Sequence, residues 1–273
     1  PAGVPEVFVV QEYADLDAAG RDMANGRIYA VVTSKEVYVD NTNPPIAAYI
    51  ARAFQRSKLE IKPFWSQEYE YIHFFLPAII VVTIFMSAYQ GGGMPIVQDK
   101  ERGVIAKYLV TPVTRAEFLL GSLLGGFVKC LAPALVSLGI AVFALGGRYT
   151  GGGAGIVNIL MLMMISTIGS LGLSIWLALR LNYSLYYALG MLFNAFIMGL
   201  SGLFYPIESL PSVMQFIARL NPITYAIHAT KIVLIKNGSL LDLPLDLIYL
   251  SIFSAGMFVL GVISLRGYSL EAQ

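Results

Sequence analysis

The sequence predicts a mainly α-helical, polytopic membrane protein with a small α/β domain at its amino-terminal end. Of the 273 residues, 57% are hydrophobic and 13% are charged, and the mean hydropathy is +0.69. A soluble domain of this size is far less apolar. The apolar residues also gather in long segments separated by short polar ones, which is the pattern of transmembrane helices.

Residues 1–68 contain no spanning segment and predict the α/β domain. Strands are expected at residues 7–10, 28–32 and 36–39. A helix is expected after the turn Asn43-Pro44-Pro45, because apolar residues from Ile46 to Phe54 recur at helical spacing. About 68 residues make only a marginal core, so we expect this domain to be incomplete at its front edge.

The transmembrane domain, residues 69–273, contains five candidate spans, at residues 72–97, 118–145, 156–179, 183–205 and 247–265. Pro77 and the triplet Gly91–Gly93 interrupt the first span, so we expect a kinked or broken helix there. The second span carries Gly121 and Gly125, a spacing of small residues that favours close packing between helices of one chain or of a dimer.

The third span is rich in small residues as well, which predicts packing against a neighbouring helix; these are Ser166, Gly169, Ser170 and Gly172. Only two or three residues separate the third span from the fourth. We therefore expect these two spans to form a tight antiparallel hairpin.

Basic residues predict the orientation, because short loops rich in lysine and arginine stay in the cytoplasm. The residues concerned are Lys100, Arg102, Lys107, Arg115, Arg180 and Arg266. They place the loop after the first span and the carboxyl terminus inside, and residues 1–68 outside. A polar domain does not cross a membrane by itself, so we expect a sixth span upstream of Pro1.

The segment 98–112, QDKERGVIAKYLVTP, predicts a short amphipathic helix in that cytoplasmic loop. Pro112 ends this helix, and Thr114 with Glu117 forms a capping box for the next one. Two interpretations are open from spacing alone. The segment is either a docking helix for a cytoplasmic partner or a solvated loop whose charges only set the topology.

A second polar segment, 206–238, predicts two short amphipathic helices at the outer interface. Ser212 and Gln215 have the spacing of a capping box for the first helix. Asn221 and Pro222 fit the N-cap and first position of the second helix, which we expect to end at Asn237-Gly238.

Three stretches resemble motifs of ABC-2-type transporter permeases. These are Glu101-Arg102-Gly103 followed by Leu109-Val110-Thr111-Pro112, the segment FYPIESLP at 204–211, and LNPITY at 220–225. The match extends over residues 70–266. NGRIYAVV at 25–32 and VDNTNP at 39–44 are similar to the extracytoplasmic insertion that many members carry after their first span, a span that we expect upstream of Pro1.

The resemblance implies a permease that dimerises on two copies of a separate ATP-binding subunit, with ATP and Mg²⁺ bound there. The coupling residues would be Lys100, Glu101, Arg102, Gly103, Lys107 and Tyr108. An outer gate would contain Pro206, Glu208, Pro211, Asn221 and Pro222, with a capping role for Glu208 equally open. We expect export of a lipophilic or amphipathic substrate across a prokaryotic plasma membrane.

The sequence contains no G-x-x-x-x-G-K-[ST] loop, so ATP hydrolysis is expected on another polypeptide and no enzyme activity on this one. The net charge of +1 argues against nucleic acid as a partner. The two histidines and the single Cys130 predict no metal site.

Lys129 is the basic residue well inside a span, and two roles are open for it. It lies on the substrate path, or its stem carries the ammonium group to a lipid headgroup or a water-filled dimer cavity. No span contains Asp or Glu, which argues against an ion-coupled secondary transporter. A membrane-anchored receptor or assembly protein acting through the outer domain remains the alternative function.

Overall fold

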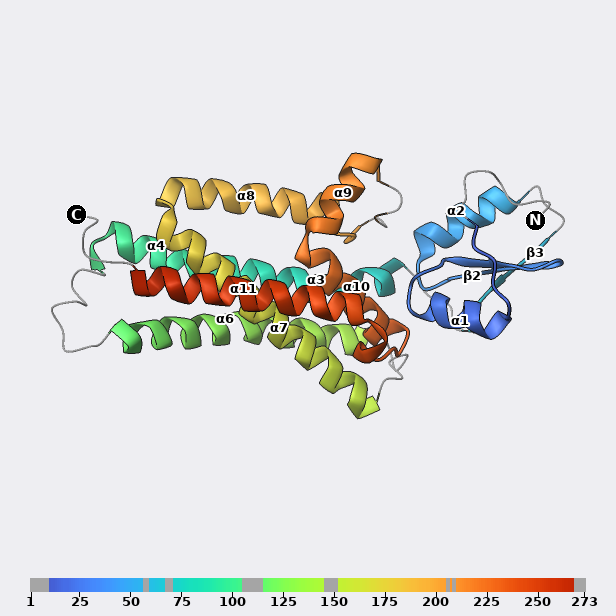
Figure 1. Ribbon diagram of the computed structural model, residues 1–273, viewed down its shortest axis with the longest axis horizontal. Coiled ribbons are helices and arrows are strands. Elements are labelled where there is room, and N and C mark those ends of the chain that lie inside the picture. The colour runs from blue at the N-terminus through green and yellow to red at the C-terminus, as the bar shows by residue number, and fades with distance from the viewer. Residues whose placement is uncertain are drawn as a thin grey trace.

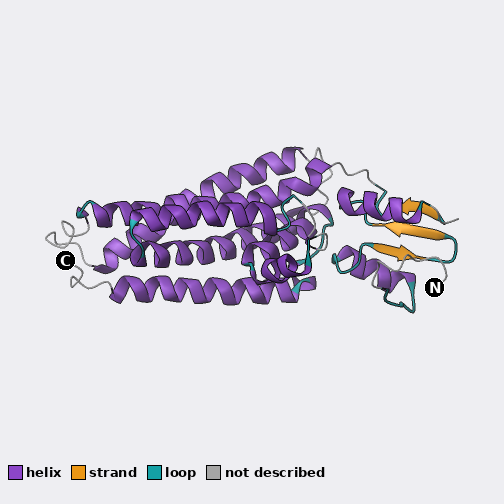
Figure 2. Cartoon of the chain, turned by 90° about the horizontal axis from the view of Figure 1, so that it is seen from above, coloured by secondary structure: helices purple, strands orange, loops and turns teal. Residues whose placement is uncertain are grey.

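The computed structural model describes residues 10–55, 59–66, 71–104, 115–144, 152–204, 207 and 210–267. They form an elongated bundle of helices with an α/β domain at one end (Figure 1). The strands are confined to that domain (Figure 2). Helix α4 (Met94–Glu101) lies at the opposite end of the bundle from that domain (Figure 1).

The α/β domain consists of α1 (Leu16–Ala24), β1 (Ala30–Val32), β2 (Glu36–Val39), α2 (Pro44–Phe54) and β3 (Glu60–Pro63). Strand β2 pairs antiparallel with β1 and parallel with β3. The predicted β1, β2 and α2 are confirmed, because alternate residues Val37 and Val39 are buried against Ile50 and Phe54. Helix α1 and strand β3 were not predicted. Of the strand expected at 7–10, residues 7–9 lie outside the described residues.

Glu36 on β2 gives this domain a pH dependence. Lys62 Nζ lies 2.5 Å from Glu36 Oε1, and Tyr38 donates to Glu36 Oε2. The hydrogen bond from Lys62, followed by that from Tyr38, lowers the pKa of Glu36 below its ordinary value of 4.5. The folded state therefore binds this proton more weakly than the unfolded state. The stabilisation is complete above pH 4.5 and is lost as the pH falls through the lower folded pKa.

We accordingly expect Glu36→Gln to make the domain less stable at neutral pH but less sensitive to acid. Trp65, which follows β3, can report the transition by its fluorescence in a Trp176→Phe background. The wild-type protein should lose its folded signal more steeply than the Gln variant as the pH falls below 4.5. Equal acid sensitivity of the two proteins would contradict a stabilising role for the Glu36 carboxylate.

The first predicted span is one continuous helical run with an irregular centre. It comprises α3 (Tyr71–Ser87), the π-helix η1 (Ala88–Gly93) and α4 (Met94–Glu101). The expected interruption at the glycine triplet is therefore a π-helical turn and not a break. Pro77 lies inside α3. This run extends through Glu101, so residues 98–101 belong to α4.

The remaining long helices are α6 (Arg115–Ala144), α7 (Gly152–Arg180), α8 (Tyr183–Leu200) and α11 (Pro244–Gly267), with the short 3-10 helix η3 (Leu240–Asp242) before α11. By length and composition, four helical segments of the described residues can cross a membrane: Tyr71–Glu101, Gly121–Phe143, Gly153–Arg180 and Pro244–Ser264. In α8, the expected fourth span, the apolar helix found among the described residues is shorter, Tyr183–Ile197. These segments identify a multi-pass membrane protein.

Helices α7 and α11 pack with their backbones in contact, as the small residues of the third span predicted. A Cβ on Gly172 would lie 2.5 Å from the backbone of Met257 and Phe258, and one on Gly169 would lie 2.5 Å from Ser254 Oγ. The predicted hairpin of the third and fourth spans is present only near its turn. The connection is tight and Tyr186 of α8 reaches Ser174 of α7, but α8 packs mainly against α4 and lies along one edge of the bundle (Figure 1).

The two short helices predicted within residues 206–238 are present as α9 (Ser212–Leu220) and α10 (Pro222–Ile235). Helix α9 is amphipathic, with Val213, Phe216 and Leu220 strongly exposed. Helix α10 lies deeper than the predicted interface position, because most of its residues are buried between α3, α7 and α11 and only the face with Pro222, Tyr225, His228 and Lys231 is half-buried. Its apolar residues pack inside the bundle, where the backbone groups of the helix interior are bonded within the helix.

Candidate functional site

Lys100 joins the end of α4 to the end of α7. Its Nζ donates hydrogen bonds to the carbonyl oxygens of Ala178 at 3.2 Å, Leu179 at 3.3 Å and Leu181 at 2.6 Å. The last carbonyls of a helix lack partners within the helix and carry its negative partial charge. A lysine ammonium satisfies both needs, so Lys100 fixes the carboxyl end of α7 to α4.

Glu101 joins the same helix to the start of α8. Its Oε1 accepts a 2.6 Å hydrogen bond from the backbone N–H of Tyr183, the first residue of α8. A carboxylate is favourable there because the free N–H groups carry positive partial charge. Asn182 adds a side-chain cap by accepting from the N–H of Leu185 at 2.9 Å. Two adjacent residues of α4 thus bind the facing ends of α7 and α8.

The predicted coupling residues therefore divide into two groups. Lys100 and Glu101 contact their own chain, which spacing alone did not indicate. Arg102 and Gly103 follow in an exposed turn, and Gly103 has a φ of +64°. Lys107 and Tyr108, with most of the expected helix at 98–112, lie outside the described residues. The Thr114 cap is outside them as well, and the described part of α6 begins at Arg115.

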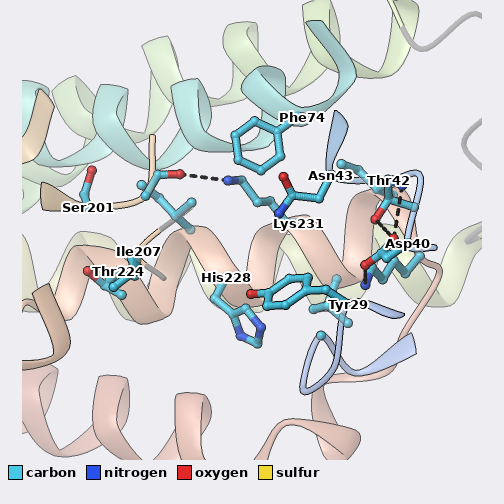
Figure 3. Close-up of a pocket in the computed structure, with 16 residues that line it drawn as sticks. Tyr29, Asp40, Thr42, Asn43, Phe74, Ser201, Ile207, Thr224, His228 and Lys231 are labelled. Atoms are coloured by element: carbon cyan, nitrogen blue, oxygen red, sulfur yellow. Dashed lines mark hydrogen bonds and ion pairs between the residues drawn. The ribbon is translucent and has the colours of Figure 1, made fainter. Parts of the chain in front are cut away.

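At the opposite end of the bundle, a cavity of about 90 Å³ lies between the α/β domain and α10 (Figure 3). Lys231 of α10 forms part of its wall. Its Nζ donates to the carbonyl oxygen of Gly202 at 2.8 Å and lies 3.4 Å from the centroid of the Phe74 ring. A cation over an aromatic face is electrostatically favourable. Asn43 and Thr224 also line the cavity, and each has a buried side-chain oxygen without a hydrogen-bond partner in the described chain.

A buried ion pair attaches the α/β domain to the end of α10. Lys236 Nζ lies 2.6 Å from Asp40 Oδ2 and donates to the carbonyl oxygen of Met23 at 2.7 Å. The two charged side chains are 7% and 1% exposed. Asp40 Oδ1 also accepts from the backbone N–H of Thr42 at 3.0 Å and from its hydroxyl at 2.6 Å. This carboxylate is therefore fully bonded, and it holds the strand-to-helix turn of the domain on α10.

A second polar pair stands beside the cavity. His228 Nδ1 lies 2.9 Å from Asp246 Oδ2, which connects α10 to α11. The other face of His228 contacts the turn after α1, where Gly26 has a φ of +70° and a Cβ would lie 2.8 Å from His228 Nε2. Glycine is required at this position by both the backbone conformation and the close approach of the histidine ring.

Of the residues expected at the outer gate, the structure describes Pro211, Asn221 and Pro222. Asn221 caps α10 by accepting from the N–H of Ile223 at 3.1 Å, and Pro222 is its first residue, as predicted. The capping box expected at Ser212 is wrong, because Pro211 is the N-cap residue of α9 and Gln215 donates to the carbonyl oxygen of Leu210. Pro206 and Glu208 lie outside the described residues.

The second span presents its predicted residues to the outside of the chain. Gly121 and Gly125 are exposed or nearly so, and a Cβ at either position would meet nothing within 4 Å. They make no close helix contact within the described chain. Lys129 is exposed on the same helix, and its stem packs against Gly91 of η1.

Sequence reasoning missed Asp40, His228, Lys231 and Lys236 as members of one site. The pattern that could have indicated it is the row of basic residues in α10, an otherwise apolar helix. That helix was assigned to the interface, where such charges need no partner. The described residues contain no group of three His, Cys, Asp or Glu side chains that could hold a metal ion.

Comparison with known proteins places these features in a family. The family described as "ABC-2 family transporter protein" matches residues 4–263. The probable multidrug ABC transporter permease YbhS of Escherichia coli K12 is 27% identical over 188 residues, which cover 68% of this chain and 49% of YbhS. The probable multidrug permease YbhR of the same organism is 22% identical over 184 residues, which cover 67% and 50% of the two chains.

The chain thus spans about half the length of the curated relatives that it matches. The family match extends over nearly all of the sequence, from the α/β domain through the last long helix. With its apolar spanning helices, this chain belongs to the ABC-2 family of transporters as a membrane-spanning permease.

Proposed function

We propose that this chain is the permease subunit of an ATP-driven exporter that moves lipophilic or amphipathic substrates out across the plasma membrane of a prokaryotic cell. One observation supports the coupling role above all others. Lys100 and Glu101, at the end of α4, bind the ends of both α7 and α8. A force applied to the segment that follows α4 would therefore reach three helices together.

In this proposal, segment 98–112 is the coupling helix and a separate ATP-binding subunit, in two copies, moves it. ATP and Mg²⁺ are bound by that subunit. Arg102, exposed in the turn after α4, contacts the partner, while Lys100 and Glu101 pass the movement on. The α/β domain and the gate formed by α9 and α10 are outside the cell, and segment 98–112 and the carboxyl terminus are inside.

A second copy of the chain, or a homologous permease, completes the transporter. The exposed face of α6 with Gly121 and Gly125 supports this association, because small residues allow helix backbones to approach. Exposed apolar side chains of α8, among them Leu185, Met191 and Leu192, suit either this partner or lipid. The names of YbhS and YbhR as probable multidrug permeases support a lipid-soluble, drug-like cargo.

Purification from the native membrane in mild detergent tests the proposal. Mass spectrometry should find an ATP-binding polypeptide in equal amount, and the complex should hydrolyse ATP. Purification of the chain alone, without ATPase activity, would remove the exporter and favour a receptor or assembly role for the α/β domain.

Within that complex, we expect Glu101→Leu to lower substrate-stimulated ATPase activity and export to near the basal level. The change removes the carboxylate that accepts from the first N–H of α8, which is worth about 0.3–1 kcal/mol at an exposed helix N-terminus, and with it the link between α4 and α8. Glu101→Gln is the matched control, because its amide oxygen can still accept from Tyr183. Arg102→Ala should also uncouple the complex, without affecting the folding of the chain. Normal stimulation in Glu101→Leu and Arg102→Ala would contradict the coupling assignment.

A further inference from the structure

The π-helical turn η1 is held by hydroxyl groups from two other helices. Ser174 Oγ of α7 donates to the carbonyl oxygen of Ala88 at 2.7 Å, and Tyr186 Oη of α8 donates to that of Tyr89 at 2.8 Å. A π turn displaces backbone carbonyls from their usual helical partners. Within a membrane no water replaces those bonds, so these side chains stabilise the irregular turn.

The bonding between η1 and α8 is reciprocal. The Tyr89 hydroxyl donates back to the carbonyl oxygen of Tyr186, and the two rings stack with their centroids 4.3 Å apart. Tyr186 is fully buried, and its Oη lies 3.1 Å from Ser174 Oγ. We call Tyr89, Ser174 and Tyr186 the tyrosine cluster.

Two glycines allow the cluster to form. A Cβ on Gly93 would lie 2.0 Å from Tyr186 Oη and 2.7 Å from the backbone oxygen of Ser174. A Cβ on Gly190 would lie 2.3 Å from the Tyr89 ring. The glycine triplet that interrupts the first span therefore provides the space in which a buried tyrosine of α8 reaches the π turn.

The tyrosine cluster attaches α8 to η1, three residues along α8 from the hydrogen bond between Tyr183 and Glu101. Beyond it, most of the described side chains of α8 are exposed or half-buried, with Ile197 as a further buried one. Reversion of η1 to a regular α-helix would rotate α4 relative to α3 by about 100°, the angle of one helical residue. A movement of the coupling segment would then be taken up by rotation within the run α3–η1–α4 and would not be passed on to α8.

We propose that Tyr89, Ser174 and Tyr186 are positioning residues for transport. They hold η1 in its π form, so that α4 and α8 move as one body when the coupling segment moves. This inference rests on the proposed function as an ATP-driven permease. In this role, η1 transmits the movement of the coupling segment to α8, in addition to packing against α7 and α8.

Tyr186→Phe tests this role, because it removes one hydroxyl and keeps the stacked ring. Tyr187→Phe, at an exposed neighbouring position on α8, is the matched control. In the complex with its ATP-binding subunit, we expect Tyr186→Phe to assemble and retain basal ATPase activity. Its substrate stimulation and export should fall by about fivefold or more, in the range of coupling between sites. Tyr187→Phe should behave as wild type.

A distance measurement on the chain alone, in lipid nanodiscs, separates this inference from the proposed function. Spin labels at Gln98 of α4 and Leu192 of α8 should give one narrow distance distribution in the wild type and a second population in Tyr186→Phe. Ser174→Ala should produce the same change. An unchanged distribution and unchanged stimulation in both variants would overturn the positioning role, and so would failure of both variants to fold. Absence of ATPase activity from the purified wild-type complex would overturn the proposed function only.

Discussion

Gly172→Ala is expected to be among the most destabilising single-methyl changes in this chain. The added Cβ would lie 2.5 Å from the backbone carbon and oxygen of Met257 and the backbone nitrogen of Phe258. No side-chain rotation can relieve contacts with backbone atoms, so α7 and α11 must separate. Overpacking of a close-packed interior costs about 1–3 kcal/mol, and we expect the upper part of this range. Thermal unfolding in detergent measures the loss.

Gly139→Ala is the matched control, since a Cβ at this position in α6 would meet nothing within 4 Å. Alanine in place of glycine favours a helix by about 0.5–1 kcal/mol, so this variant should be as stable as wild type or slightly more stable. Equal stability of Gly172→Ala and Gly139→Ala would show that α7 and α11 do not pack through direct backbone contact.

The second large effect is expected at the ion pair between the α/β domain and α10. Lys236→Met leaves the Asp40 carboxylate, 1% exposed, without its counter-charge. Removing one partner of a buried pair costs about 3–5 kcal/mol, because an uncompensated charge remains in the interior. We expect the α/β domain to separate from α10 and become sensitive to limited proteolysis, at a lower melting temperature than the bundle.

A double variant distinguishes the charge from the packing. Asp40→Asn combined with Lys236→Met removes both charges and should recover part of the loss. Lys62→Met breaks the solvent-exposed pair with Glu36 and should cost much less, because exposed ion pairs are screened and contribute little to stability, which makes it the surface control. If Lys236→Met were no more harmful than Lys62→Met, the buried pair would not be what attaches the domain.

Several features followed from the sequence because they depend on local properties. A run of some twenty apolar residues is too long and too apolar for an ordinary core helix, and the four long apolar helices among the described residues follow this rule. Strands β1 and β2 were visible as short runs rich in β-branched and aromatic residues, and α10 in the pair Asn221-Pro222, whose cap involves only its own first turn. The small residues of α7 predicted close packing correctly, although the partner, α11, could not be named.

The sequence by itself therefore determined the membrane class, the position of most helices and the family to which the motifs belong. Tertiary structure alone decided which side chains act together. Asp40 and Lys236 are 196 residues apart, and Lys100 finds its carbonyl partners about 80 residues further along the chain. The burial of most of α10, the packing of α8 against α4 and the π form of η1 were decided in the same way. The physical reason is that each depends on hydrogen bonds and contacts with distant segments, and local periodicity carries no information about those.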